Sequence, residues 1–241
     1  MTSAVPAQLT PPLLLLSGLL CDASIWDAQR AALADIAEVH VLDFPGIDSV
    51  QQMAAQTLAA APDQFALAGH SMGGRVALEI VRQAPERVQR LALLDTGVHP
   101  AHAHAQEHAQ RGALVELARR DGMQVLARQW LPPMLHPDRH DDAELMDALM
   151  AMVMRQTPQS YAAQVTALLN RPDAAPVLAQ VQCPTLLGVG RQDSWSPLER
   201  HQDMARQIPH AQLVVFEHSG HMTPVEAPAA VNAALRDWLA A

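Results

Sequence analysis

The chain has 241 residues, of which 49% are hydrophobic and 17% charged, and its formal net charge at pH 7 is −9. This composition is typical of a globular protein and excludes a largely disordered chain, while the negative charge disfavours nucleic acid and anionic membrane surfaces as partners. All sixteen basic residues are arginine, which excludes mechanisms that need a catalytic lysine.

Short apolar strands alternate with amphipathic helices in two parts of the chain. The predicted strands are 13–17, 39–42, 65–69, 88–95, 185–190 and 213–217, and the predicted helices are 25–36, 50–61, 73–84, 198–207 and 228–239. Such alternation predicts βαβ units, because a parallel strand needs a crossover helix to return to the same edge of the sheet. We therefore predict an α/β fold with a doubly wound, mostly parallel sheet of about six strands.

The stretch 99–178 has a different character. It is rich in Ala, Leu, Met and Gln, shows no strand pattern, and contains prolines that divide it into several helices. Since it follows the fourth predicted strand, we expect it to cover the carboxyl edge of the sheet, where ligands bind in such folds. The predicted division is an α/β core of residues 1–98 and 179–241 and a helical cap of residues 99–178.

The first apolar run and the two cysteines give information about the cellular compartment of the protein. The run 13–21 is similar to a short signal segment that ends in a lipidated cysteine, but no basic residue precedes Arg30 and the bulky Leu20 stands before Cys21. The run is also too short to span a bilayer. Two thiols far apart, Cys21 and Cys183, are typical of a reducing compartment. We expect a cytoplasmic protein with no membrane insertion.

The segment Gly69-His70-Ser71-Met72-Gly73 matches the pattern G-x-S-x-G, directly after an apolar strand and at the start of a helix. Glycines on both sides permit a turn so tight that it holds the serine hydroxyl above the sheet. The adjacent helix N-terminus favours developing negative charge. Ser71 is therefore the predicted nucleophile, and the alternative is a glycine-rich turn without a reactive group.

A serine hydroxyl becomes a good nucleophile only when a neighbouring base takes its proton. His221 follows the last strand at the same sheet edge as Ser71, and we prefer it to His218, the nearest other histidine. Asp193 ends the preceding strand and can orient the imidazole, while Asp95, at the end of the fourth strand, is the alternative acid. The chain order Ser, Asp, His is the one that such a sheet requires.

Two backbone N–H groups are expected to stabilise the negative oxygen of a tetrahedral intermediate. One belongs to Met72, the residue after the nucleophile. The other lies in the loop after the first strand, where we prefer Leu19 and keep Leu20 as the alternative. These donors form the predicted oxyanion hole.

Large apolar side chains predict an apolar acyl pocket, although the same spacing is common in ordinary cores. The candidates are Trp26, Trp130, Met134, Met150, Met154 and Trp195. No arginine stands out as a carboxylate or phosphate clamp, and Arg75 is interpreted as a charge on a helix surface. The histidines of the cap lack the spacing and the partners of a zinc site, so we expect no metal.

Together these motifs resemble the α/β-hydrolase superfamily over essentially the whole chain, and more closely the small bacterial esterase-like members with a helical cap. The matching segments are Ser17-Gly18, Gly69–Gly74, Gly190-Arg191-Gln192-Asp193 and Ser219-Gly220-His221. The resemblance implies a central parallel sheet, a Ser-His-Asp triad and no cofactor. Ser17 stands where many members have histidine, and Phe44-Pro45-Gly46 replaces their usual Arg-Gly-His-Gly turn.

We therefore expect a serine hydrolase (EC 3.1.1) that cleaves a carboxylic ester, with a small or medium apolar acyl group, through an acyl-enzyme on Ser71. Its partner is then a small-molecule ester-like substrate. The same triad also serves thioester, lactone or carbon–carbon bond cleavage and lyase reactions, because the fold does not fix the chemistry. A ligand-binding, receptor-like protein on a hydrolase scaffold is the alternative from another class.

Overall fold

A single parallel sheet forms the centre of the computed structural model, which describes residues 11–101 and 105–241. The strands within these ranges are β1 (Leu13–Leu16), β2 (Val39–Leu42), β3 (Phe65–His70), β4 (Val88–Leu94), β5 (Thr185–Gly190) and β6 (Gln212–Phe216). They lie in the order β2-β1-β3-β4-β5-β6, and every neighbouring pair is parallel. The predicted α/β class and the six-stranded sheet are confirmed.

The central strands are buried along their whole length. Every residue of β1, β3 and β5 is buried, and a strand covered on both faces has a continuous apolar sequence instead of an alternating one. The apolar run that is similar to a signal segment therefore contains the buried strand β1. Within the described ranges, none of the helices combines the length and the apolar character needed to cross a membrane.

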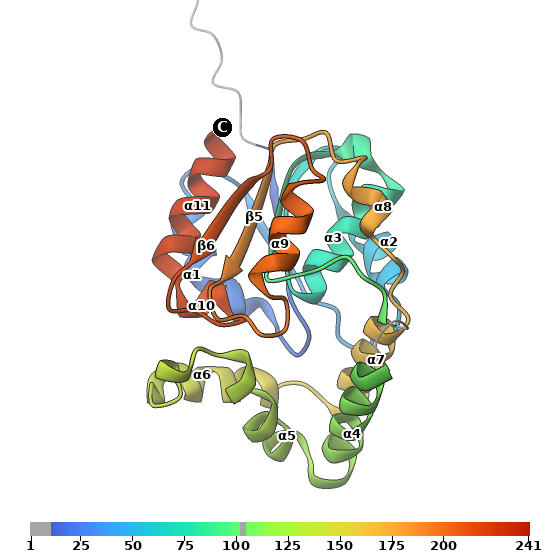
Figure 1. The fold of residues 1–241 in the computed structure, drawn as a ribbon, viewed down its shortest axis with the longest axis vertical. Coiled ribbons are helices and arrows are strands. Elements are labelled where there is room, and N and C mark those ends of the chain that lie inside the picture. Colours follow the sequence, from blue (N-terminus) through green and yellow to red (C-terminus); the bar gives the residue numbers. More distant parts are fainter. Residues whose placement is uncertain (1–10, 102–104) are drawn as a thin grey trace, which may run out of the picture.

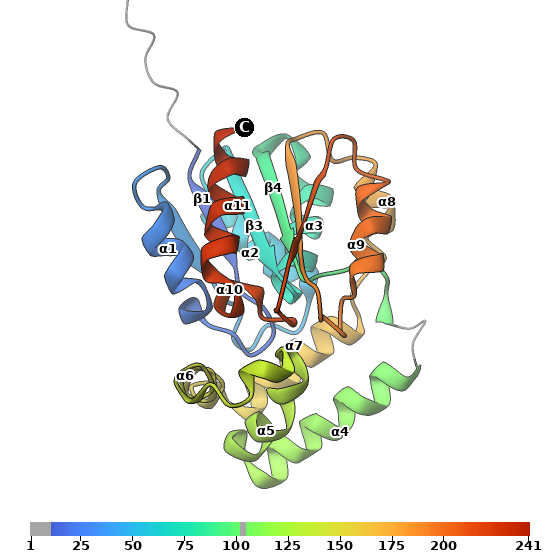
Figure 2. The ribbon, with the colours of Figure 1, turned by 60° about the vertical axis from the view of Figure 1, so that its left-hand side comes forward.

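Helices cover both faces of the sheet (Figure 2). Helices α1 (Asp27–Leu33) and α11 (Pro228–Ala240) pack together on one face. Helices α2 (Val50–Ala60), α3 (Met72–Gln83) and α9 (Leu198–Ala205) lie on the other. The short α10 (Thr223–Glu226) and the 3-10 turns η1 (Ala23–Trp26) and η2 (Pro85–Arg87) connect these elements. The result is a doubly wound sheet, as predicted.

A group of helices lies across the carboxyl ends of the strands, beyond the arrowheads in Figure 1. It comprises α4 (Ala105–Asp121), α5 (Met123–Trp130), η4 (Pro132–Met134), η5 (Pro137–Arg139), α6 (Ala143–Met154) and α7 (Pro158–Leu169). This confirms a helical cap after the fourth strand. Helix α8 (Ala175–Leu178) already contacts α3 of the core, and the exact domain boundaries remain a prediction.

Candidate active site

Ser71 lies at the sharp turn between β3 and α3, with a positive φ of 53°. Its N–H donates to the Leu94 carbonyl (2.9 Å), and the Thr96 hydroxyl donates to the Ser71 carbonyl (2.7 Å). A Cβ at Gly69 or Gly73 would overlap the neighbouring backbone. The turn therefore needs both glycines, and the structure holds a strained serine at the edge of the sheet.

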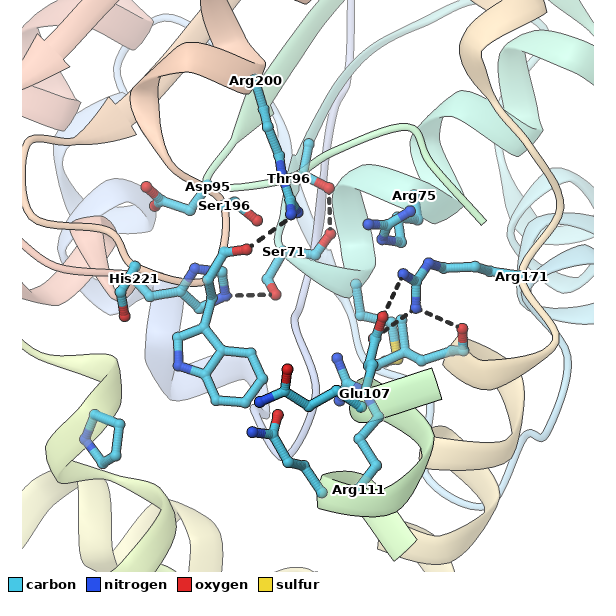
Figure 3. Close-up of a pocket in the computed structure, with 17 residues that line it drawn as sticks. Ser71, Arg75, Asp95, Thr96, Glu107, Arg111, Arg171, Ser196, Arg200 and His221 are labelled. Carbon is cyan, nitrogen blue, oxygen red and sulfur yellow. Dashed lines mark hydrogen bonds and ion pairs between the residues drawn. The ribbon is translucent and has the colours of Figure 1, made fainter. Parts of the chain in front are cut away.

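Ser71, His221 and Asp193 form one chain of hydrogen bonds, although the three residues come from separate loops. The Ser71 Oγ atom lies 2.8 Å from His221 Nε2, and His221 Nδ1 lies 2.8 Å from Asp193 Oδ2 (Figure 3 shows the first contact). The second carboxylate oxygen accepts from the N–H groups of Trp195 (2.8 Å) and Ser196 (2.9 Å). Burial raises the pKa of Asp193, but the contact with His221 and these N–H groups lower it overall.

Asp95, the alternative acid, has different partners. It is fully buried, and its carboxylate accepts from the Gly190 N–H (2.9 Å) and from the Thr223 hydroxyl. Burial and the nearby charge of Asp193 raise the pKa of Asp95 well above its ordinary value. The structure therefore brings Asp193, and not Asp95, to the imidazole of His221.

His70, next to the nucleophile, holds the backbone of His221. The Nε2–H group of His70 donates to the His221 carbonyl oxygen over 2.7 Å. Because a carbonyl only accepts, this contact places the proton of His70 on Nε2, and Nδ1 has no partner among the described residues. Burial and the neighbouring charge of His221 lower the pKa of His70 to about 3.

Glu226 anchors the loop that carries His221 from the other side. One carboxylate oxygen accepts from the His136 N–H of the cap (2.7 Å), and the other accepts from the N–H groups of Gly220 and Met222 (3.0 Å each). The two latter residues flank His221 in the chain. Sequence reasoning missed Glu226, since a glutamate five residues after the predicted base resembles any helix-surface charge.

The loop after β1 distinguishes between the two candidate oxyanion donors. The Leu20 N–H donates to Gln164 Oε1 of the cap (3.0 Å), and Gln164 Nε2 donates to the Phe44 carbonyl (3.1 Å). Among the described residues, the N–H groups of Leu19 and Met72 donate to no other group, and both residues line cavities next to Ser71. The backbone N–H groups of Leu19 and Met72 are thus available to donate hydrogen bonds to a ligand oxygen.

Two compartments of different character adjoin Ser71. The smaller one holds about 30 Å³ and is mainly apolar, with Arg111 and His70 as further polar lining residues besides Ser71 and His221; its apolar wall is formed by Leu19, Cys21, Trp130, Met134, Leu168, Trp195 and Met222. The larger one holds about 720 Å³ and is lined by Arg75, Glu107, Arg111, Arg171 and Arg200 among others (Figure 3). Arg75 therefore lies on the pocket wall, which corrects its interpretation as a helix-surface charge.

Three predicted pocket residues, Trp130, Met134 and Trp195, line the cavities beside Ser71, whereas the other three do not. Trp26 is fully buried in the core and packs edge-on against His70, with ring centroids 6.4 Å apart. Met150 and Met154 line a separate hollow of about 800 Å³. They are four residues apart on one face of α6, while its buried face is formed by Leu149, Met152 and Val153. Met150 and Met154 therefore lie outside the two compartments beside Ser71.

One group of described residues has the geometry to hold a metal ion. Ligand atoms of His136, Asp138 and His218 lie within 4.8 Å of one another. Two of these residues are exposed, and the Nδ1 atom of His136 already accepts from the Asp138 N–H (3.1 Å). None of the three is among the residues that line the two compartments beside Ser71.

The arrangement of sheet, strained serine and hydrogen-bonded histidine agrees with comparisons to known proteins. The family model described as the alpha/beta hydrolase family matches residues 13–234. The protein belongs to the α/β-hydrolase family. A pimeloyl-[acyl-carrier protein] methyl ester esterase of Nitrosomonas europaea is 30% identical, over 88% of each chain.

Two further similar proteins are also hydrolases. An (E)-2-((N-methylformamido)methylene)succinate hydrolase of Acinetobacter baylyi is 27% identical, with 95% of this chain and 90% of that protein covered. A malate-bound thermophilic esterase structure from Thermogutta terrifontis is 31% identical, with a TM-score of 0.84 and coverage of 95% and 89%. The α/β-hydrolase described here is thus an enzyme of the hydrolase class, and two of these three similar proteins are named as esterases.

The buried, neutral His70 generates a prediction about stability and pH. Its pKa of about 3 in the folded state lies below the ordinary value of 6.5, so the unfolded chain takes up a proton first as the pH falls. His70 therefore contributes its full stabilisation above pH 6.5 and loses it at lower pH. As the pH falls from 6 to 4, the free energy of unfolding of the wild type should decrease by about 1.4 kcal/mol per pH unit more than that of His70→Gln.

Urea unfolding at pH 7, 6, 5 and 4 measures this difference. Glutamine keeps an N–H donor for the His221 carbonyl but does not titrate, and His40→Gln on the exposed side of β2 is the matched control. Equal pH dependence in the wild type and His70→Gln would show that His70 is not held neutral.

The anchoring of the His221 loop by Glu226 leads to a second prediction. In Glu226→Gln one carboxylate oxygen is replaced by an NH₂ group. This group cannot accept the hydrogen bonds that the backbone N–H groups donate to the glutamate. A displaced imidazole should lower kcat about 10–100-fold with a smaller change in KM. Steady-state ester hydrolysis measures both constants, with the exposed Glu199→Gln as control. A wild-type kcat in Glu226→Gln would rule out this positioning role.

Proposed function

We propose that the protein is a serine carboxylesterase that cleaves small carboxylic esters through an acyl-enzyme on Ser71. The observation that supports this most directly is the chain of two 2.8 Å contacts, from Ser71 Oγ to His221 Nε2 and from His221 Nδ1 to Asp193 Oδ2. A serine hydroxyl is activated when a base contacts it and an acid contacts that base.

In the first half of the proposed reaction, Ser71 Oγ attacks the ester carbonyl carbon while His221 Nε2 takes the hydroxyl proton. Asp193 stabilises the imidazolium that forms, and the N–H groups of Leu19 and Met72 stabilise the negative carbonyl oxygen. His221 then gives the proton to the departing alkoxide, which leaves an acyl group on Ser71.

In the second half, His221 takes a proton from a water molecule, and the resulting hydroxide attacks the acyl carbonyl carbon. The same two N–H groups stabilise the second tetrahedral intermediate. Its collapse breaks the bond to Ser71 Oγ, which regains a proton from His221. The products are a carboxylic acid and an alcohol, and the enzyme returns to its initial state.

The shape of the smaller compartment supports a small apolar group on one side of the scissile bond. Its volume of about 30 Å³ is close to the space that one water molecule occupies in the liquid. Trp130, Met134 and Met222 give it an apolar wall. A relative is named for the hydrolysis of a methyl ester, which agrees with a group of this size.

Two further parts of the proposal concern organisation and location. We assign residues 99–178 to the cap and the remaining residues to the core, because the helices over the strand ends fall within that stretch. We also propose a cytoplasmic location. It is supported by the two cysteines, Cys21 and Cys183, which are both free thiols.

The role of Ser71 gives the test of this function. Hydrolysis of p-nitrophenyl acetate, butyrate and octanoate by Ser71→Ala should fall at least about 10³-fold, because the acyl-enzyme cannot form. The wild-type kcat/KM should decrease from acetate to octanoate if the apolar group enters the smaller compartment. Ser49→Ala, at the start of α2, is the matched serine control. Undiminished hydrolysis by a folded Ser71→Ala protein would refute the proposed nucleophile.

A further inference from the structure

The larger compartment beside Ser71 concentrates positive charge in a protein whose net charge is −9. Four of the sixteen arginines line it, namely Arg75, Arg111, Arg171 and Arg200 (Figure 3). The acidic residues on the same wall are Glu107 and Asp95. How these six charges pair decides what kind of ligand the compartment accepts.

Glu107 offsets one of the two positive charges that Arg111 and Arg171 bring to one side of the compartment. Its two oxygens accept from Arg171 Nη1 (2.7 Å) and Nη2 (2.8 Å), and one of them also accepts from Arg111 Nε (2.8 Å). Burial raises the pKa of Glu107, but the hydrogen bonds and charges of the two arginines bring it down to about 2. Glu107 is therefore ionised and fully occupied by Arg111 and Arg171.

Asp95 does not neutralise the positive charges of Arg75 and Arg200. Its two oxygens accept from the Gly190 N–H and the Thr223 hydroxyl, and it forms no ion pair with an arginine in the described part of the chain. Burial and the charge of Asp193 also raise its pKa well above the ordinary value. Asp95 therefore supplies little negative charge to the compartment.

Arg75 and Arg200 have only backbone carbonyls as hydrogen-bond acceptors among the described residues. Arg75 Nη1 donates to the His99 carbonyl (3.1 Å), and Arg200 Nη1 donates to the Trp195 carbonyl (3.3 Å). Each guanidinium has five N–H groups, so most of these donors stay available. Burial is the main cause that lowers the pKa of Arg75; the nearby charge of Arg171 lowers it further, and the charge of Glu107 acts in the opposite direction.

The two side chains pass the same residue of the pocket region, Gly97. A Cβ placed on Gly97 would lie 3.5 Å from Arg75 Nη2 and 3.9 Å from Arg200 Cδ. The side chains therefore flank Gly97 from two elements, α3 and α9. Arg171 Nε donates to the same His99 carbonyl (2.9 Å) as Arg75, so these two guanidinium groups are neighbours, and Figure 3 shows Arg200 on the other side of Arg75, close to Ser71.

We propose that the substrate carries a carboxylate, which Arg75 and Arg200 bind in the larger compartment while Ser71 attacks the ester. This inference rests on the proposed function and narrows its substrate class. The substrate is then a half-ester of a dicarboxylic acid or the ester of a hydroxy acid. A carboxylate suits the site because guanidinium groups bind it through paired N–H donors.

The test compares charged and neutral esters of the same shape. Mono-4-nitrophenyl glutarate and adipate carry the carboxylate in the acyl part, and 4-nitrophenyl 5-oxohexanoate and 6-oxoheptanoate are their neutral counterparts. Acetoxyacetate and 3-acetoxypropanoate, with their neutral methyl esters, place the carboxylate in the alcohol part, and release of acetate follows their cleavage. Rates with Ser71→Ala are subtracted throughout, because a free carboxylate also promotes uncatalysed cleavage.

The measured quantity is the ratio of kcat/KM for the charged ester to that for its neutral counterpart. The wild type should give a ratio of at least about 10 in one series, and Arg75→Gln and Arg200→Gln should each lower it about 10-fold or more. Arg128→Gln removes the same charge from an exposed position on α5 and should leave the ratio unchanged.

Two outcomes would overturn the inference. Ratios of 1 or less in both series would show that no carboxylate is preferred, and a preference that survives both arginine substitutions would place its origin elsewhere. Either result leaves the proposed esterase function intact, provided that the neutral esters are cleaved and Ser71→Ala is inactive on them. If the wild type hydrolysed none of these esters, the result would instead contradict the proposed function itself.

Discussion

The hydrogen bond between Ser71 and His221 depends on backbone contacts from three separate parts of the chain. His70 of the core holds the His221 carbonyl, Met134 of the cap accepts from the His221 N–H (2.7 Å), and Glu226 binds the N–H groups on both sides of it. An imidazole fixed in this way needs little reorganisation when charge develops. The remaining features of the site, from the oxyanion donors to the pocket, are arranged around this fixed position.

The cap is consequently part of the candidate catalytic apparatus and not only a cover. Through Gln164 it holds the loop that offers the Leu19 N–H, and through Met134 and His136 it contacts the loop of His221. Arg111 of α4 and Arg171, after α7, contribute to the charged compartment. A displacement of the cap would therefore alter the base, the oxyanion donors and the substrate pocket together.

Sequence patterns predicted the elements of this structure that depend on local chemistry. A buried strand has a continuous apolar sequence, and the turn at Ser71 requires glycines at fixed spacing, so the sheet and the positions of Ser71, Asp193 and His221 could be predicted. The choice of Asp193 over Asp95 followed from strand order, because adjacent strand ends lie close together. The structure now places these three side chains in contact.

The features that sequence reasoning missed depend on packing between distant segments. Gln164 and Glu226 bind backbone N–H groups of other loops, and nothing in their own neighbourhood indicates that. Arg75 and Arg200 lie 125 positions apart and line one pocket only because α3 and α9 both begin beside it. Met150 and Met154 share one face of α6, and their helical spacing does not indicate whether that face meets the pocket.

The proposed mechanism requires Ser71 to carry the acyl group during turnover. Acid quenching of the enzyme during hydrolysis of p-nitrophenyl acetate, followed by proteolysis and peptide mass spectrometry, tests it directly. We expect a peptide that contains Ser71 and is heavier by one acetyl group, with fragment ions that locate the acetyl on the serine. Turnover with the acetyl group on another residue would rule out Ser71 as the nucleophile.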